Sequence, residues 1–432
     1  MNFAVPEWLA LDEDRRAAAL RRPAQSSGDL EQRVTEIIAT VRRDGDAALR
    51  ALSLELDGVE PASLAVPEAE IQAADAHCDP ALLKSMDRAL SRIEAFHRAG
   101  MPLDFRLETA PGLVCEARYL PVSPVGLYVP GGSAPLVSSV LMLATPARLA
   151  GCQEVVLCTP PDKSGRVHPA VLAAARRCGV RRIFAVGGAQ AIAAMAYGTE
   201  SIPRSAKVFG PGNAWVTEAK RQVANDPDGA AQDMPAGPSE VMVIADAGAD
   251  PQAVCWDLLS QAEHGPDSQA ILISDSRALL DAVANALPGL AAGLPRTEVL
   301  QKSLQSLRLI RVAGLEEAIG IAERYAPEHL ILNCADAQNL CDKVRRAGSV
   351  FIGRWTPESL GDYSSGTNHV LPTYGHARSY SGLSVSDFMR RMTIQTASRE
   401  GLREAGADAM ALAAAEGLDA HRMAVAYRLG AS

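Results

Sequence analysis

Residues 183–197 read Ile-Phe-Ala-Val-Gly-Gly-Ala-Gln-Ala-Ile-Ala-Ala-Met-Ala-Tyr, a short apolar run followed at once by an alanine-rich pattern. The run predicts a buried strand and the pattern predicts a helix. The same alternation of a strand and a helix occurs before and after this stretch. The expected strands are 154–157 and 208–209, and the expected helices are 169–177, 190–197 and 214–223. Repeated units of this kind build a parallel sheet covered on both faces.

A second series of strands and helices follows the first. Its expected strands are 241–245, 270–274, 309–312, 330–332 and 350–352. The first hundred residues have apolar residues at helical spacing, and helical patterns return after Pro372. The predicted fold class is therefore α/β, with two doubly wound, incomplete Rossmann-like parallel-sheet domains between helical N-terminal and C-terminal segments.

Composition and charge exclude several classes of protein. The 432 residues are 48% hydrophobic and 22% charged, with a net charge of −9 and no block of Lys or Arg. This argues against disorder, and against non-specific binding to nucleic acid or to an anionic membrane. The most apolar stretch, 137–147, is interrupted by polar residues and is shorter than the roughly 18 residues of a membrane span. Residues 12–14 are acidic, whereas a signal peptide would have its apolar core at these positions. We therefore expect a cytoplasmic protein.

The eight cysteines contain no C-x-x-C pair. In a reducing compartment they are expected to be small buried hydrophobic residues, and a thiolate zinc site is not expected.

A glycine-rich turn, Gly210-Pro-Gly-Asn-Ala-Trp215, follows one expected strand and opens a helix. Trp215 occupies the position of the third glycine in the dinucleotide-binding pattern. The turn is either a simple connection or a place where a nucleotide lies against a helix N-terminus.

Several polar residues have the chemistry of metal ligands. Gln261 and His264 share one face at the end of an expected helix. The alternative interpretation is that His264 interacts only with the dipole at the helix C-terminus. Asp362 stands in a polar loop after the strand 350–352, the side of a parallel sheet where sites commonly lie, or is a turn residue. Glu416 and His421 flank Gly417, where one helix ends and another begins, and either is equally an ordinary surface residue.

Glu328 and His329 precede the apolar run 330–332. A carboxyl group and an imidazole side by side suit proton transfer. On a regular strand they would point to opposite faces, so a joint role requires an irregular backbone; the alternative is an exposed pair.

Together, these segments resemble the histidinol dehydrogenase family, which carries out the last two oxidations of histidine biosynthesis. The resemblance runs from about 126 to 421. The matching runs are Gly126-Leu-Tyr-Val-Pro-Gly-Gly-Ser-Ala-Pro135, Val186-Gly-Gly-Ala-Gln190, Phe209-Gly-Pro-Gly-Asn213, Asp233-Met-Pro-Ala-Gly-Pro-Ser-Glu240, Leu259-Ser-Gln-Ala-Glu-His-Gly-Pro-Asp267, Tyr325-Ala-Pro-Glu-His329, Leu360-Gly-Asp362, Gly366-Thr-Asn-His-Val-Leu-Pro372 and Glu416-Gly-Leu-Asp-Ala-His421.

The resemblance implies a role for each of these residues. It implies one Zn²⁺ per subunit, held by Gln261, His264, Asp362 and His421, and catalytic residues Glu328 and His329. It implies NAD contacts at Tyr128, Gln190 and Asn213. It implies that L-histidinol is bound by Ser239, Gln261, His264, His329, Asp362, Glu416 and His421. Gln232, Trp215 and Met392 depart from the residues usual in the family, and none of them is a ligand.

The expected division of the chain has four parts. Residues 1–23 form a helical N-terminal segment, 24–127 and 239–381 a discontinuous first α/β domain with the metal and catalytic residues, and 128–238 an NAD-binding second α/β domain. Residues 382–432 form a helical C-terminal segment, which a homodimer would exchange between its subunits. Glu416 follows Asp362 by more than fifty residues, a length that permits such docking at little cost in loop entropy.

The implied reaction is a four-electron oxidation of L-histidinol by two NAD, through L-histidinal. His329 would be the general base and Glu328 would activate water. One alternative is a related zinc-dependent dehydrogenase of another small amino-alcohol or diol, although Glu416 favours a cationic substrate. Another is a non-catalytic metal-binding subunit, against which the intact Glu328 and His329 argue. A cysteine nucleophile, Cys115 or Cys152, is a rival chemistry without a paired base.

Overall fold

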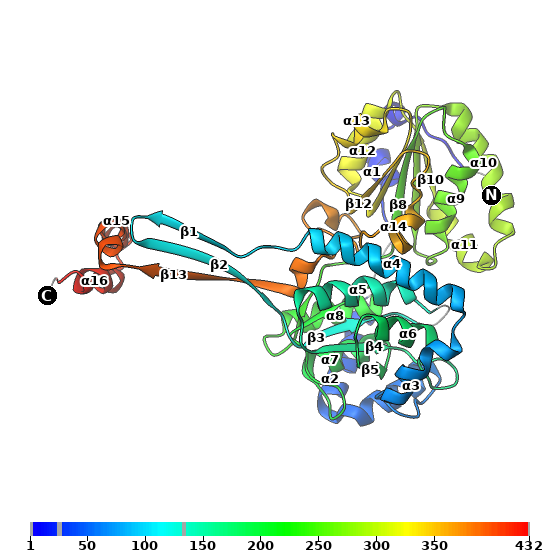
Figure 1. The fold of residues 1–432 in the computed structure, drawn as a ribbon. Helices are drawn as coiled ribbons and strands as arrows, with labels where there is room; N and C mark the ends of the chain where they lie inside the picture. The colour runs from blue at the N-terminus through cyan, green and yellow to red at the C-terminus, as the bar shows by residue number, and fades with distance from the viewer. Residues whose placement is uncertain (1–2, 24–27, 132–134, 431–432) are drawn as a thin grey trace.

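The structure is a computed structural model that describes residues 3–23, 28–131 and 135–430. Residues 132–134 of the run 126–135 therefore lie outside the described residues. Within these ranges, the chain forms two lobes, each built on a parallel sheet, and a long arm (Figure 1). The predicted α/β class with two parallel-sheet domains is confirmed.

The first lobe contains a five-stranded sheet in the order β5-β4-β3-β6-β7. Helices α5 and α6 share a core with one face, while α7 and α8 share a core with the other. The strand order reverses between β3 and β6. The elements are β3 (Val125–Tyr128), α5 (Val137–Ala150), β4 (Val155–Thr159), α6 (Pro169–Arg177), β5 (Arg182–Ala185), α7 (Gly188–Tyr197), β6 (Lys207–Phe209), α8 (Ala214–Asn225) and β7 (Ala231–Gln232).

The second lobe repeats this plan with the order β10-β9-β8-β11-β12. Its order reverses between β8 and β11, and its two faces are covered by α9 and α10 and by α12 and α13. The elements are β8 (Glu240–Ala245), α9 (Pro251–Ala262), β9 (Gln269–Ser274), α10 (Arg277–Ala292), α11 (Thr297–Ser303), β10 (Arg308–Arg311), α12 (Leu315–Tyr325), β11 (His329–Asn333), α13 (Ala337–Cys341), β12 (Ser349–Ile352) and α14 (Glu358–Tyr363).

The N-terminal helices are α1 (Glu13–Ala19), α2 (Gly28–Leu52), α3 (Glu68–Ala73) and α4 (Pro80–Ala99). Apolar residues of α2 lie in one core with α7, α8 and the first sheet, and those of α3 and α4 lie in the core on its other face. The packing thus groups 28–99 with the first lobe, whereas the predicted division joined 24–127 to 239–381. The reason is that amphipathic helices reveal an apolar face but not the sheet that will cover it.

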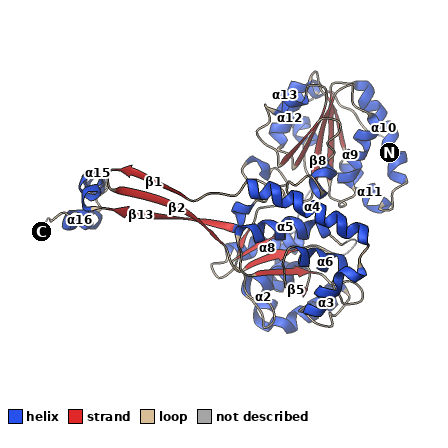
Figure 2. Cartoon of the chain, in the orientation of Figure 1, coloured by secondary structure: helices blue, strands red, loops and turns tan. Residues whose placement is uncertain are grey.

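Three antiparallel strands, in the order β1-β2-β13, form the arm (Figure 2). They are β1 (Phe105–Ala110), β2 (Leu113–Pro121) and β13 (Met389–Ala397), and the arm ends in α15 (Arg399–Ala415) and α16 (Asp419–Arg428). The prediction that 382–432 is helical is therefore wrong over β13. Most side chains of β13 are exposed, and its partner β2 is distant in sequence, so no buried alternation marks the strand. The helix break at Gly417 is confirmed, since this residue has φ 71°.

The remaining helical elements are short 3-10 or π-helical turns. They are η1 (Trp8–Ala10), the π-helical η2 (Ser53–Asp57), η3 (Ala74–His77), η4 (Leu304–Ser306), η5 (His376–Arg378) and η6 (Val385–Phe388). None of the helices in the described ranges has the length and apolar character needed to cross a membrane.

Candidate active site

Glu328 and His329 lie where β11 begins, and both side chains are buried. Ala326, just before them, has a left-handed backbone with φ 55°, so the chain is irregular at this point. Glu328 Oε2 lies 3.6 Å from His329 Nδ1. The two side chains are therefore neighbours in space, and the backbone is irregular just before them.

The backbone of Glu240, the first residue of β8, contacts both side chains. Its N–H donates a hydrogen bond to Glu328 Oε2 at 2.8 Å, and its carbonyl oxygen lies 3.2 Å from His329 Nδ1. Because a carbonyl oxygen only accepts, Nδ1 carries a proton, and the lone pair of a neutral His329 is on Nε2. That atom lies 3.6 Å from Asp362 Oδ1 and has no hydrogen-bond partner among the described residues.

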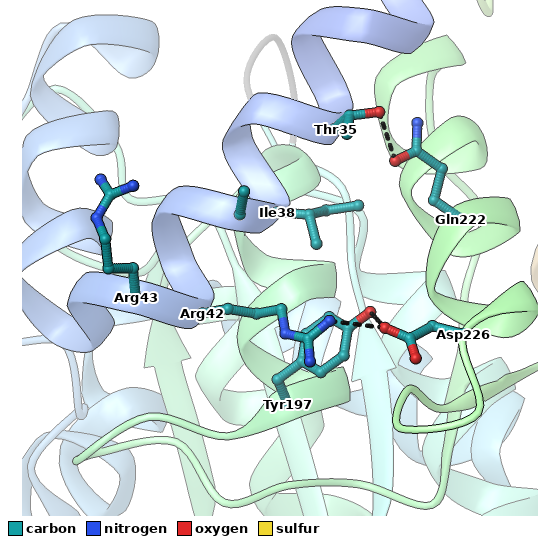
Figure 3. Close-up of a pocket in the computed structure, with 8 residues that line it drawn as sticks. Thr35, Ile38, Arg42, Arg43, Tyr197, Gln222 and Asp226 are labelled. Atoms are coloured by element: carbon teal, nitrogen blue, oxygen red, sulfur yellow. Dashed lines mark hydrogen bonds and ion pairs between the residues drawn. The ribbon is translucent and has the colours of Figure 1, made fainter.

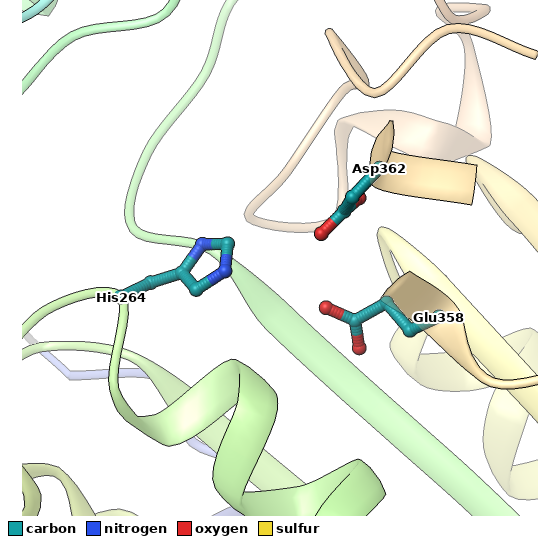
Figure 4. A group of neighbouring side chains, drawn as sticks. All are labelled: His264, Glu358 and Asp362. Carbon is teal, nitrogen blue, oxygen red and sulfur yellow. The ribbon is translucent and has the colours of Figure 1, made fainter. Parts of the chain in front are cut away.

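Three side chains with metal-ligand chemistry gather beside this pair: His264, Glu358 and Asp362 (Figure 4). One ligand atom from each lies within 4.8 Å of the others. His264 follows α9, whereas Glu358 and Asp362 are one turn apart on α14. Gln261, in the last turn of α9, is fully buried. Neither its amide atoms nor the carboxylate oxygens of Glu358 have a hydrogen-bond partner in the described ranges, and a cation would satisfy such oxygens.

Glu358 was not among the predicted metal ligands. A usable signal existed, because Glu358 and Asp362 have the i, i+4 spacing that places two carboxylates on one helix face. It was obscured because the preceding Pro357 and the following Gly361 are typical of a turn.

The arm separates two predicted residues from the others. Glu416 and His421 are exposed, in the helices at the far end of the arm (Figure 1). One chain therefore brings Gln261, His264 and Asp362 to one region, but not His421. Ser239 is half-buried directly before β8.

The catalytic candidates lie at the amino ends of β8 and β11, not at the carboxyl ends where parallel sheets commonly carry their sites. The expectation that Asp362 follows the strand 350–352 into a carboxyl-edge site is thus corrected. The segment after α14 crosses to the first lobe, where Asn368 Nδ2 donates to the carbonyl oxygen of Met142 in α5 at 2.7 Å. Asp362 lies beside His329 at this edge because α14 is on the side of the second lobe that faces the first lobe (Figure 1).

Burial and charge shift the protonation equilibria of this site. Burial raises the pKa of Glu328 to about 8 and the pKa of Glu358 to about 8. Burial alone would lower the pKa of His329, but the carboxylates of Glu358, Glu328 and Asp362 raise it to about 10. Burial opposes ionisation of Asp362, yet the imidazoles around it hold its pKa below the ordinary value.

The predicted NAD contacts come from three segments at the carboxyl edge of the first sheet. Tyr128 ends β3 and its hydroxyl oxygen accepts a hydrogen bond from Gly188 N at 3.1 Å. Gln190 is buried in the first turn of α7, with both amide atoms unpartnered among the described residues. Asn213 caps α8, accepting from the backbone of Trp215 and Val216. The reversal of strand order between β3 and β6 is where such sheets bind nucleotides.

Buried side chains hold the Gly210 turn. Asp233 Oδ2 accepts from Gly210 N at 2.8 Å, and Lys220 Nζ donates to the Gly210 carbonyl oxygen at 2.9 Å. Of the three residues that the resemblance sets apart from the usual family pattern, Trp215 lies in the first turn of α8, Gln232 in β7 and Met392 in the arm.

A separate surface pocket of about 510 Å³ lies between α2, α7 and α8 (Figure 3). Its polar groups pair with one another: Arg42 Nη1 donates to Asp226 Oδ2 at 2.7 Å, and the Tyr197 hydroxyl donates to the same oxygen at 2.8 Å. Thr35 Oγ1 likewise donates to Gln222 Oε1 at 3.0 Å. None of the predicted site residues lines this pocket. The hydrogen-bonding groups of Arg42, Asp226 and Tyr197 are already paired with one another, so they do not indicate a ligand.

Known proteins match this chain over nearly its whole length. The family model "Histidinol dehydrogenase" matches residues 20–429. Histidinol dehydrogenase from Xylella fastidiosa is 57% identical over 429 residues, covering 99% of each chain, and that from Vibrio parahaemolyticus is 49% identical, covering 98% of this chain and 97% of its own. The crystal structure of histidinol dehydrogenase from Elizabethkingia anophelis superposes with a TM-score of 0.94 at 41% identity, covering 99% of this chain and 98% of that one. The chain therefore belongs to the histidinol dehydrogenase family of oxidoreductases.

Proposed function

We propose that this chain catalyses the NAD-dependent four-electron oxidation of L-histidinol to L-histidine through L-histidinal. The observation that carries the proposal is the buried Glu328–His329 pair beside the group His264, Glu358 and Asp362, in a chain of this family. An acid–base pair next to a set of nitrogen and oxygen ligands suits the oxidation of an alcohol that also carries metal-binding groups.

The residues fit a divalent cation such as Zn²⁺. Gln261, His264 and Asp362 would hold it, with His421 of the partner subunit, and the unpartnered oxygens of Glu358 lie in the same group. When bound, the ion supplies positive charge that orients the amino and imidazole groups of the substrate. These proposed ligands form one site, so one ion per subunit is proposed.

His329 is the proposed general base. Its Nδ1 is engaged by the Glu240 carbonyl oxygen, so Nε2 is free to take the proton of the substrate hydroxyl while hydride leaves for the nicotinamide. Two of the carboxylates that raise the His329 pKa, those of Glu358 and Asp362, lie in the group that would hold the cation and would be neutralised by it. In the loaded site the neutral imidazole is therefore accessible nearer to neutral pH.

Glu328 is proposed to activate the water that hydrates the aldehyde. The Glu240 N–H fixes one of its oxygens, and burial gives it a pKa near that of a useful base. A cysteine nucleophile fits less well. All eight cysteines are free, but burial raises the pKa of Cys152 to about 11, and Cys115 lies in the arm.

NAD is proposed to bind across the carboxyl edge of the first sheet, in contact with Tyr128, Gln190 and Asn213, and to accept the hydride in each oxidation. The position of these residues at the strand-order reversal and the unpartnered amide of Gln190 support this placement. Ser239 and Glu416 are proposed substrate contacts.

The active unit is proposed to be a homodimer in which the arm of each chain reaches the other chain. The arm exposes large apolar side chains, among them Phe105, Leu107, Leu412 and Tyr427. An isolated arm of this kind gains stability by covering such surface on a second copy, and the exchange would bring Glu416 and His421 to the partner's Asp362.

The reaction is tested by its stoichiometry. Purified protein loaded with Zn²⁺ and given L-histidinol and NAD should form two NADH for each L-histidine, measured by NADH absorbance and by chromatography of the product. One NADH per substrate with no acid, or NADH formation only with another amino-alcohol or diol, would favour the alternative dehydrogenase. No NADH with any of these substrates would favour a non-catalytic metal-binding subunit.

Glu328→Gln separates the two oxidations. Only the aldehyde needs activated water, so we expect oxidation of L-histidinal to slow by about 10²-fold or more while oxidation of L-histidinol falls much less. The two halves are measured with L-histidinol and L-histidinal as separate substrates, and the metal content is checked as a control. Equal losses in both halves would remove the assignment of water activation to Glu328.

The His329 pKa should depend on the cation. In metal-free protein His329 stays protonated through neutral pH, because its pKa is about 10. With Zn²⁺ bound, the carboxylates of Glu358 and Asp362 are neutralised, so the titration of His329 should move to lower pH. Nuclear magnetic resonance (NMR) of histidine-labelled protein follows this titration, with the His329→Asn variant identifying the signal. A pKa that Zn²⁺ does not lower would contradict the proposed cation position.

A further inference from the structure

A buried ion pair lies behind the catalytic pair. Arg22, between α1 and α2, donates from Nε to Glu240 Oε2 at 2.6 Å and from Nη2 to Glu240 Oε1 at 2.8 Å. The side chains are 12% and 2% exposed, so the bidentate pair is shielded from water. A pair of this geometry has a fixed orientation.

The carboxylate of Glu240 is joined by its own backbone to the catalytic groups. The same residue donates its N–H to Glu328 and presents its carbonyl oxygen to His329. Because β8 and β11 are paired with Val241 opposite His329, Glu240 stands opposite Glu328. A displacement of Glu240 would therefore move both partners of the pair.

Arg22 also holds the turn that precedes Glu328. Its Nη2 donates to the carbonyl oxygen of Tyr325 at 2.9 Å, and its guanidinium lies 3.7 Å from the centre of the Tyr325 ring. The Tyr325 hydroxyl lies 2.9 Å from Glu240 Oε2. The next residue, Ala326, has the left-handed backbone that a non-glycine residue adopts only when its surroundings enforce it.

We propose that Arg22 and Glu240 are positioning residues for the oxidation: the ion pair fixes the start of β8 and the Tyr325–Ala326 turn, and these in turn fix Glu328 and His329. This inference rests on the proposed function, because it takes Glu328 and His329 as the catalytic groups. Neither Arg22 nor Glu240 needs to touch the substrate. Their effect is on kcat, since they orient groups that act in the transition state.

The test compares three variants. Arg22→Ala leaves the Glu240 carboxylate buried without its ion-pair partner, which destabilises the fold. The double variant Arg22→Met with Glu240→Gln removes both charges and approximately keeps the side-chain volumes. Arg177→Met is the matched control, because Arg177 is 13% exposed and forms ion pairs with Asp75 and Asp87 in the first lobe.

We expect the double variant to fold with the Zn²⁺ content of the unaltered chain, to lose about 10- to 100-fold in kcat and to keep KM for L-histidinol within about threefold. Arg177→Met should keep kcat. Added guanidinium ion should restore part of the kcat of Arg22→Ala, which it would not do for a merely destabilised protein. An unchanged kcat in the folded double variant would overturn the proposal.

A second readout is independent of turnover. The NMR signal of His329 should shift in the double variant and stay unchanged in Arg177→Met. If the unaltered chain does not oxidise L-histidinol, the proposed function fails, and the His329 signal alone decides whether the ion pair positions this residue. An unshifted signal would overturn the positioning role.

Discussion

Replacing His329 by asparagine is expected to lower kcat by about 10²- to 10⁴-fold in both oxidations, the range for loss of a general base. The reason is that both the alcohol and the hydrated aldehyde must lose a hydroxyl proton as hydride leaves. Asparagine still offers an N–H to the Glu240 carbonyl oxygen, which His329 Nδ1 faces at 3.2 Å, so the local fold should persist.

The measurement is kcat with L-histidinol and with L-histidinal, alongside the thermal midpoint and the bound Zn²⁺. His329→Asn should differ from Glu328→Gln in slowing both halves. If His329→Asn oxidised L-histidinol at the rate of the unaltered chain, another group would have to be the base.

Removal of the cation should have a comparably large effect. We expect protein treated with a chelator and then freed of it to lose at least about 10²- to 10³-fold in turnover, because a Lewis-acidic ion contributes several kcal/mol and each 1.36 kcal/mol is a factor of ten. The secondary structure should be retained. The ligand-bearing ends of α9 and α14 belong to a lobe with its own extensive core.

Circular dichroism reports the retained fold, metal analysis confirms removal, and added Zn²⁺ should restore turnover. Gln261→Ala provides a matched variant, since it removes one buried oxygen without changing charge and should weaken Zn²⁺ binding. Full turnover by protein verified as metal-free would show that the cation is not part of the reaction.

The two parallel sheets could be predicted from the sequence, but the three-stranded arm could not. Buried strands such as β8 and β9 are continuous apolar runs between helical patterns, so their class and order are local information. β13 pairs with β2, more than two hundred residues away in the chain, and its side chains are mostly exposed. Strands held by distant partners carry little local signal.

The site residues were predictable where they belong to continuous sequence motifs. They were not predictable where tertiary packing alone brings them together. Glu328 and His329 were found as neighbours in the chain, but their common contact with the backbone of Glu240 is created by the fold and is not visible in the sequence. Glu358 was missed because Pro357 and Gly361 are typical of a turn, and its burial beside Asp362 is visible only in the fold. The ion pair of Arg22 with Glu240 joins residues 218 positions apart, a contact that only the fold creates.

Each working site is proposed to contain residues of two chains, and mixing two inactive variants tests this most directly. His421→Ala removes the proposed ligand on the arm, and His329→Asn removes the base in the second lobe. If the arm acts on the partner, a mixed dimer has one site with both lesions and one with neither. Random exchange of subunits should then restore roughly a quarter of the original activity, because half of the dimers are mixed and half of their sites are intact. If the arm serves its own chain, every site keeps one lesion, and absence of activity after demonstrated subunit exchange would contradict the account.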